Sequence, residues 1–254
     1  MRKILIIGMG AGNPDYMTIQ AIDALNKVDV FFIPDKGNEK AALRKLRTDI
    51  CARFIKAKTH RFVEMPVPKR AEVFSDYKSN VADWHAEIEA NYARLLREEL
   101  GEHECAGFLV WGDPAIYDST LRIIENIRAR GGIEFDYEVI PGISAVQALA
   151  ARHRVPLNRI GESIHITTGR KLADGYPADA DSVVVMLDGE QTFQKIDGEF
   201  EIYWGAYLGT DEEVLISGRL PDVASEIVGI RAERRERNGW IMDSYLIRRP
   251  EKQP

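Results

Sequence analysis

Cysteine and long apolar runs are both scarce in this sequence. The 254 residues include two cysteines, Cys51 and Cys105, which lie far apart and in no Cys-x-x-Cys spacing. This pattern does not indicate a disulfide framework and is typical of a reducing compartment. No run approaches the roughly 20 apolar residues that a membrane-spanning helix needs. We therefore expect a cytoplasmic protein that does not associate with a membrane.

An excess of positive charge is also missing. The formal net charge is -6, which argues against nucleic acid as the partner. A solvated surface accounts for the most basic segment, residues 53–70, although a substrate rich in carboxylates would also favour such a patch. The five histidines are scattered. The adjacent residues Glu102–Cys105 carry metal-ligand side chains but rarely converge on one ion, so we expect no metal site.

The length suits one large α/β domain or two of moderate size. The segment Val155–Gly161 carries the proline and glycine of a linker, and the pattern beyond it is richer in strands. We expect an N-terminal α/β domain over residues 1–157, with a parallel sheet and a mostly helical insertion over residues 36–100, and a C-terminal α/β domain over residues 158–254. The strands expected in the second domain are Ser163–Thr168, Ser182–Leu187, Phe200–Tyr207, Glu213–Ile216 and Trp240–Ile247.

A glycine-rich loop, Gly8–Pro14, follows the first predicted strand, Lys3–Ile7, whose apolar stretch is too short for a signal peptide. A helix over about residues 14–26 and a second strand ending at Pro34-Asp35 come next. This order resembles a dinucleotide-binding fingerprint, but Asn13 occupies the position of the third glycine and Pro14 removes an N–H where a pyrophosphate would bind. A nicotinamide-dependent oxidoreductase with a degenerate fingerprint remains an alternative.

The stretch that the chain is organised around is Ala106–Thr120. Its first six residues are apolar or uncharged and predict a strand buried on both faces. Pro114 ends that strand, and Asp118 is placed to cap the following helix. Asp113 is thereby left on a tight loop at the carboxyl end of a strand, which is where open α/β sheets bind ligands.

A third loop, Pro141–Ser144, follows the predicted strand Ile133–Ile140. Ser144 and Gln147 have the spacing of a capping box that opens the next helix. The three loops all follow strands of one predicted parallel sheet. They should therefore lie at the same carboxyl edge and surround one crevice.

Five motifs, in this order and spacing, resemble the tetrapyrrole (precorrin) methylase family over nearly the whole chain. They are Gly8–Thr18, Trp111–Tyr117, Pro141–Ala145, Val185–Leu187 and Tyr207–Thr210. The resemblance implies the tetrapyrrole methylase fold of class III methyltransferases, with two α/β domains and the cofactor in the cleft between them. It also implies a tetrapyrrole substrate, S-adenosyl-L-methionine as methyl donor, S-adenosyl-L-homocysteine as product, and a homodimer. Within the family, the run WGDPAIYDSTLRI is most similar to a member that methylates C-1 of precorrin-5 and releases acetate.

The same resemblance implies the site residues, carried over by matching position. The cofactor-binding residues implied are Ala11, Trp111, Gly112, Asp113, Ile116, Ser144, Ala145, Met186, Leu187 and Gly209. Asp35 is the candidate catalytic base because some members carry a proton-accepting Asp at the end of the second strand; Pro34 shifts its register by one. Tyr117 is a second catalytic candidate and Asp118 a lesser one. A non-catalytic tetrapyrrole-binding protein stays open as another alternative.

Overall fold

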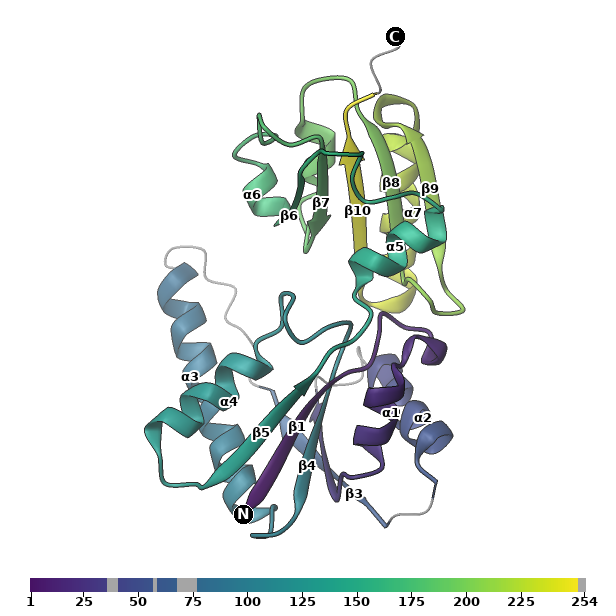
Figure 1. Ribbon diagram of the computed structural model, residues 1–254. Helices are drawn as coiled ribbons and strands as arrows, with labels where there is room; N and C mark the ends of the chain where they lie inside the picture. Colours follow the sequence, from purple (N-terminus) through teal and green to yellow (C-terminus); the bar gives the residue numbers. More distant parts are fainter. Residues whose placement is uncertain (36–40, 57–58, 68–76, 251–254) are drawn as a thin grey trace. The chain divides into compact units, whose positions relative to one another are not determined.

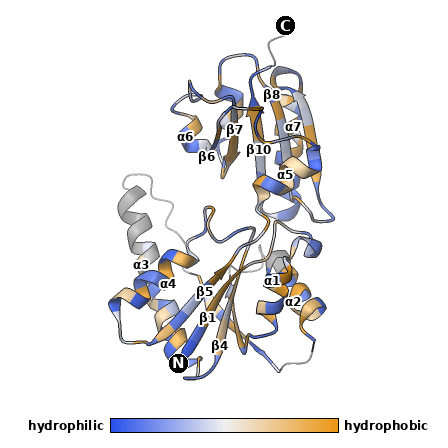
Figure 2. Cartoon of the chain, in the orientation of Figure 1, coloured by the Kyte–Doolittle hydropathy of each residue, from blue (hydrophilic) through white to orange (hydrophobic). Residues whose placement is uncertain are grey.

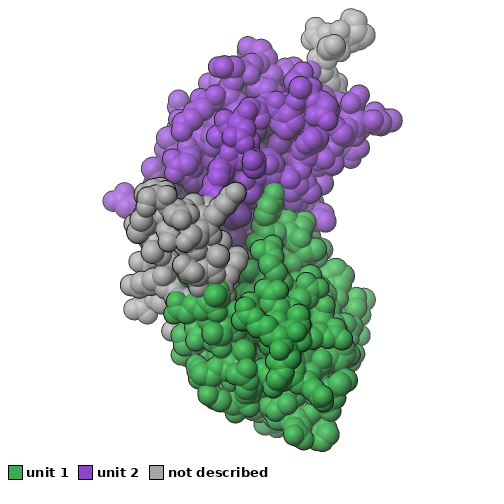
Figure 3. Space-filling model, turned by 90° about the vertical axis from the view of Figure 1, so that its left-hand side faces the viewer, with its two compact units in different colours: residues 1–10, 14–143 green, residues 11–13, 144–254 purple. Residues whose placement is uncertain are grey.

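The structure is a computed structural model that describes residues 1–35, 41–56, 59–67 and 77–250. The chain forms two compact units (Figure 3). Unit 1 comprises residues 1–10 and 14–143, and unit 2 comprises residues 11–13 and 144–254. Within the described ranges, no helix combines the length and apolar character needed to cross a membrane.

Unit 1 contains a five-stranded sheet in which all strands are parallel (Figure 1). The strand order is β3-β2-β4-β1-β5. The strands are β1 (Arg2–Gly8), β2 (Val30–Asp35), β3 (Arg61–Pro66), β4 (Cys105–Val110) and β5 (Phe135–Ile140). Every residue of β4 is buried, as its uncharged sequence predicts for a central strand covered on both faces. The predicted parallel sheet is thus confirmed.

Helices cover both faces of this sheet and divide its core in two. The helices are η1 (Pro14–Tyr16), α1 (Ile19–Leu25), α2 (Ala41–Phe54), α3 (Tyr77–Glu98) and α4 (Thr120–Arg130). One apolar cluster joins the sheet to α3 and α4, and the other joins it to α1 and α2. The helix predicted from residue 14 begins later, at Ile19, because the Thr18 side chain caps it by accepting the N–H of Ala21.

Strand β3 was not predicted, because residues 36–100 were interpreted as mostly helical and the basic segment between the two expected helices as a solvated surface. It is an edge strand that pairs only with β2 in the described sheet. Its sequence, RFVEMP, leaves Arg61, Phe62 and Glu64 exposed and buries Met65. An edge strand that is mostly exposed to solvent buries few apolar residues, so its short alternation of apolar and polar residues is easily missed.

Unit 2 contains a five-stranded mixed sheet with the order β6-β7-β10-β8-β9. Its strands are β6 (Ile164–Thr168), β7 (Ser182–Met186), β8 (Glu201–Ala206), β9 (Val214–Arg219) and β10 (Asp243–Arg248). Only β6 and β7 pair in parallel. All five strands predicted for the second half are therefore confirmed, with small shifts at their ends.

The described part of unit 2 also contains four helical segments, namely α5 (Ala145–His153), α6 (Gly169–Leu172), η4 (Thr192–Lys195) and α7 (Leu220–Asn238). The core is rich in aromatic residues, with Trp204, Tyr245 and Phe193 fully buried. Apolar residues gather along the strands of each sheet (Figure 2). Residues 144–157 pack in unit 2, and the domain division at residues 157 and 158 stays a prediction.

Candidate functional site

Three glycines bring the loops after β1, β4 and β5 into direct contact. A β-carbon built on Gly142 would overlap the carbonyl oxygen of Gly112 and lie 2.9 Å from the Cα of Gly8. A β-carbon on Gly8 would lie 2.6 Å from the nitrogen of Gly142. Only glycine permits such an approach of three backbones. The predicted convergence of the three loops at one edge of the sheet is confirmed.

Hydrogen bonds also join the first two of these loops. The N–H of Gly112 donates to the carbonyl of Gly10 at 2.8 Å, and the N–H of Gly10 donates to the carbonyl of Gly112 at 3.3 Å. Both residues have positive φ angles, +80° and +69°, which glycine adopts without the steric cost that other residues incur. Gly10, a glycine of the degenerate fingerprint, therefore joins the loop after β1 to the loop after β4.

The carboxylate of Asp113 ties the second loop to the third. Its Oδ2 accepts the N–H of Gly142 at 2.9 Å, and its Oδ1 accepts the N–H of Ala115 at 2.8 Å. Further along, the Asp118 side chain accepts the N–H of Thr120 at 2.7 Å, which confirms that it caps α4 although Ser119 occupies the N-cap position. Asp113 thus holds main chain in place with both of its oxygens.

The remaining unit 1 candidates lie on or beside the same edge. Trp111 packs against the apolar cluster under α1 and α2. Tyr117 has a φ of +52° and is 48% exposed. Partial burial raises the pKa of its phenol, so at neutral pH it can donate a hydrogen bond but accepts a proton poorly. Asp35 is the last residue of β2, in register with Pro66 of β3.

Two of the three described basic residues in this segment, Arg53 and Arg61, are paired with neighbouring carboxylates. Arg53 contacts Asp15 at 2.5 Å, and Arg61 contacts Glu104 at 2.7 Å. Lys58, Lys69 and Arg70 lie outside the described residues. These ion pairs agree with the interpretation of residues 53–70 as a solvated surface.

In unit 2, the segment that contains Ala11 packs against the loop that contains Gly209. A β-carbon on Gly12 would overlap the carbonyl oxygen of Leu208 and lie 2.9 Å from the Cγ2 of Thr210. The N–H of Gly209 donates to the Glu213 carboxylate at 2.7 Å. The structure therefore brings together two site residues that are separated by almost 200 positions in the sequence.

Ser144 and Ala145 open helix α5. The capping box predicted for Ser144 and Gln147 is confirmed, and the Ser144 Oγ accepts the N–H of Val146 at 3.2 Å. Ser144 is almost fully buried. The Ser144 hydroxyl is engaged in the cap, and Ala145 is the first residue of the helix.

Met186 ends β7, and Leu187 follows it in a left-handed conformation with a φ of +54°. The Leu187 side chain is 66% exposed. A left-handed conformation costs an ordinary residue roughly 1–2 kcal/mol, so neighbouring contacts must hold the turn. Those contacts come from Asp188, which sequence reasoning missed; its only local signal is a carboxylate directly after an apolar strand.

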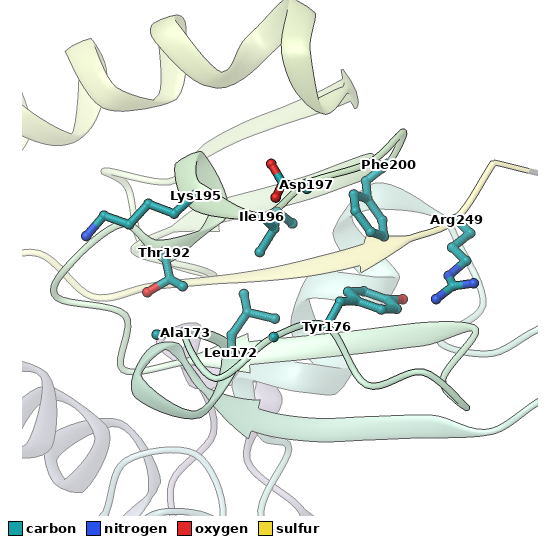
Figure 4. Close-up of a pocket in the computed structure, with 10 residues that line it drawn as sticks. Leu172, Ala173, Tyr176, Thr192, Lys195, Ile196, Asp197, Phe200 and Arg249 are labelled. Carbon is teal, nitrogen blue, oxygen red and sulfur yellow. The ribbon is translucent and has the colours of Figure 1, made fainter.

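A hollow of about 380 Å³ in unit 2 contains none of these candidates (Figure 4). It is lined by Leu172, Ala173, Gly175, Tyr176, Thr192, Lys195, Ile196, Asp197, Phe200 and Arg249. Among the described residues, no three His, Cys, Asp or Glu side chains are grouped so that they could hold a metal ion. Cys51 and Cys105 are both free and buried.

A parallel sheet with glycine-packed carboxyl-end loops, combined with a second mixed sheet, is the fold of class III methyltransferases. The model of the tetrapyrrole (corrin/porphyrin) methylases matches residues 3–224. The chain therefore belongs to the tetrapyrrole methylase family, as its motifs predict, and is a methyltransferase that uses S-adenosylmethionine.

Three individual proteins of known name are similar to this chain. The chain is 55% identical over 250 residues to precorrin-6A synthase [deacetylating] from Sinorhizobium sp., covering 98% of this chain and 96% of the relative. The crystal structure of a cobalamin synthesis related protein (CobF) from Corynebacterium diphtheriae has a TM-score of 0.84 at 39% identity, covering 99% and 100% of the two chains. Uroporphyrin-III C-methyl transferase from Thermus thermophilus, complexed with S-adenosylhomocysteine, shares the fold with a TM-score of 0.60 at 17% identity, covering 96% of each chain.

Proposed function

We propose that this chain methylates C-1 of precorrin-5 in corrin (cobalamin) biosynthesis and releases the ring-bound acetyl group as acetate, giving precorrin-6A. The observation that carries the proposal is the 55% identity, over nearly the full length of both chains, to precorrin-6A synthase [deacetylating]. No comparison supports a nicotinamide-dependent oxidoreductase or a non-catalytic carrier.

The described loops fit S-adenosylmethionine, which carries no phosphate. There is no lysine or arginine in the three loops, residues 8–14, 111–117 and 141–145. These loops therefore offer close-packed backbone and lack the positively charged side chains that would bind an anion. In unit 2, the exposed Leu187 presents apolar surface from a constrained turn. We propose that one cofactor molecule is bound by Ala11, Trp111, Gly112, Asp113, Ile116, Ser144, Ala145, Met186, Leu187 and Gly209.

The role of these residues is to bind and orient. When bound, S-adenosylmethionine would supply the methyl group: a nucleophilic ring carbon attacks the methyl carbon in line, the bond from sulfur to that carbon breaks, and S-adenosylhomocysteine leaves. The chain contributes proximity and exclusion of water, which can account for much of the barrier reduction in such a transfer. The bonds from Asp113 and the contacts among Gly8, Gly112 and Gly142 keep the loops in one geometry.

Release of acetate requires cleavage of a carbon–carbon bond by water, for which a base is useful. We propose Asp35 for that base. Tyr117 is the second candidate, and its raised pKa suits it to donate a hydrogen bond to an oxyanion. Both residues belong to unit 1, at or beyond the carboxyl ends of β2 and β4.

A ligand-binding comparison tests the cofactor. S-adenosylhomocysteine at 100 times its dissociation constant should stabilise the fold by about 2.7 kcal/mol, whereas NAD and NADP should leave the melting temperature unchanged. Stabilisation by NAD or NADP alone would support the oxidoreductase, and stabilisation by tetrapyrrole alone would support the carrier. Anaerobic turnover of precorrin-5 with a labelled methyl donor, followed by mass and acetate analysis, tests the reaction.

We also propose that the protein acts in the cytoplasm as a homodimer, as family members generally pair. Light scattering at micromolar concentration should give twice the chain mass of 28.7 kDa. A mass equal to one chain would contradict the dimer without affecting the proposed reaction.

A further inference from the structure

The buried carboxylate of Asp188 is the centre of a polar network in unit 2. Asp188 is only 4% exposed. Its Oδ2 accepts the hydroxyl of Tyr245 at 2.5 Å and the N–H of Thr192 at 2.6 Å, and its Oδ1 accepts the hydroxyl of Thr192 at 2.9 Å. Three donors therefore compensate the loss of water around this carboxylate.

The main chain of Asp188 is held as well. Its carbonyl oxygen accepts the Nη2 of Arg231, which is buried in α7, at 2.9 Å. Arg231 is oriented in turn by Asp243, whose Oδ2 accepts the Arg231 Nε and the Trp204 Nε1, each at 2.9 Å. The main chain of Asp188 is thus anchored to α7 and its side chain to β10. Asp243 links this network to Trp204 in β8.

Gly169 closes the remaining side of the carboxylate. A β-carbon at this position would overlap the Oδ1 and Cγ of Asp188 and lie 2.6 Å from its Cβ. The start of α6 can therefore reach Asp188 only because residue 169 is glycine.

This network explains how Leu187 is kept in an unfavourable conformation. A left-handed, exposed leucine persists only where its surroundings determine the backbone, and every anchor described above acts on the adjacent residue. Gln191, at the other end of the turn, is also left-handed, with a φ of +55°. The turn of residues 187–191 is therefore constrained at both ends.

We propose that Asp188 is a positioning residue that fixes the Met186–Leu187 turn for binding the adenosine part of the methyl donor. The inference rests on the proposed cofactor role of Met186 and Leu187. Asp188 acts through the turn, with Thr192 and Tyr245 as its essential donors. Loss of a donor should loosen the turn and weaken cofactor binding, while the rate at saturating cofactor changes little.

Thr192→Val is the main test, because valine keeps the shape of threonine and removes only the hydroxyl donor. We expect S-adenosylhomocysteine to bind about tenfold more weakly by calorimetry, equal to roughly 1.4 kcal/mol, and the KM for S-adenosylmethionine to rise while kcat stays within about twofold. Thr192→Ser keeps the hydroxyl and should retain near-normal affinity. Hydrogen exchange at the amides of residues 187–189 should accelerate in Thr192→Val and not in Thr192→Ser.

Tyr245→Phe provides a second test with a matched control. Tyr176→Phe removes the hydroxyl of a different, partly buried tyrosine of unit 2, which donates to the carbonyl of Asp181 at 2.9 Å, and should leave affinity unchanged. Native circular dichroism and melting temperature establish folding for each variant.

If the wild-type protein binds S-adenosylhomocysteine and folded Thr192→Val and Tyr245→Phe bind it equally tightly, the positioning role is overturned and the proposed function stands. If the wild-type protein does not bind it, the proposed function itself fails.

Discussion

The Asp113 carboxylate accepts the main-chain N–H of Gly142 at 2.9 Å, joining two loops whose contact residues are 29 positions apart. Its other oxygen accepts the N–H of Ala115. Asp113 therefore acts as a brace between neighbouring strand ends in unit 1. This relationship makes the carboxylate a structural determinant of the proposed cofactor site.

Asp113→Asn should destabilise the protein by about 1–3 kcal/mol and weaken S-adenosylhomocysteine binding, because the amide has one oxygen and can accept only one of the two N–H groups. Urea unfolding and calorimetry measure the two effects. Asp136→Asn, at an exposed position of β5, is the control and should change neither. Wild-type stability and affinity in Asp113→Asn would show that the brace is dispensable.

Gly142→Ala should destabilise the protein by about 1–3 kcal/mol or more, because its methyl group would overlap the Gly112 carbonyl and force the backbones apart. Gly229→Ala provides the matched control. It lies in α7 with no atom within 4 Å of a built β-carbon, so it should be neutral or stabilising by up to about 1 kcal/mol. Equal unfolding free energies for the two variants would contradict the close packing of the loops.

Asp35→Asn should leave S-adenosylhomocysteine affinity unchanged and slow acetate release by about 100- to 10,000-fold, because it keeps the shape of the residue and removes the proposed base. Calorimetry and an acetate assay are run on the same preparation. Normal acetate release would show that Asp35 is not the base, and Tyr117→Phe and Asp118→Asn would then be tested in the same way.

The pH dependence of stability should include a contribution from His153. Burial lowers the pKa of this imidazole, although its hydrogen bond to the Trp204 carbonyl, at 2.9 Å, acts in the opposite direction. Because the unfolded value is about 6.5, the unfolded chain binds more protons between the native pKa and 6.5. Stability from this residue is therefore fully present above about pH 6.5 and is lost as the pH falls through the native pKa.

His153→Gln tests this contribution, since glutamine can still donate to the carbonyl but does not titrate. Its unfolding free energy should fall less than that of the wild type between about pH 7.5 and about pH 5.5. The exposed His103→Gln serves as control and should keep the wild-type pH dependence. An undiminished fall in His153→Gln would assign the effect to other groups.

Sequence pattern predicted most of the fold because most elements have a local signal. The buried strand β4 is apolar throughout, and the capping box of Ser144 and Gln147 lies within four residues. The edge strand β3 was missed because its residues are mostly exposed. The spacing of apolar residues along the sequence indicates which residues are buried. At the edge of a sheet few residues are buried, so this pattern is weak there.

The anchoring of Leu187 could not be predicted from sequence, for a different reason. The donors that fix Asp188 include Tyr245 and Arg231, which lie 57 and 43 positions away. Nothing in the run Val-Met-Leu-Asp requires a left-handed residue. Such a conformation is determined by tertiary packing, which becomes visible only when the distant strands and α7 are in place.

The assignment of residues 11–13 to unit 2 has a consequence for the evolution of the chain. Unit 2 is assembled from two separate stretches of sequence, and Gly12 of the shorter one fits against Leu208 of the longer. A single genetic crossover between residues 143 and 144 would transfer the longer stretch without the tripeptide that packs on it. Exchange of this unit between relatives therefore preserves the packing only where the residue at position 12 stays compatible with the incoming loop around residues 208–210.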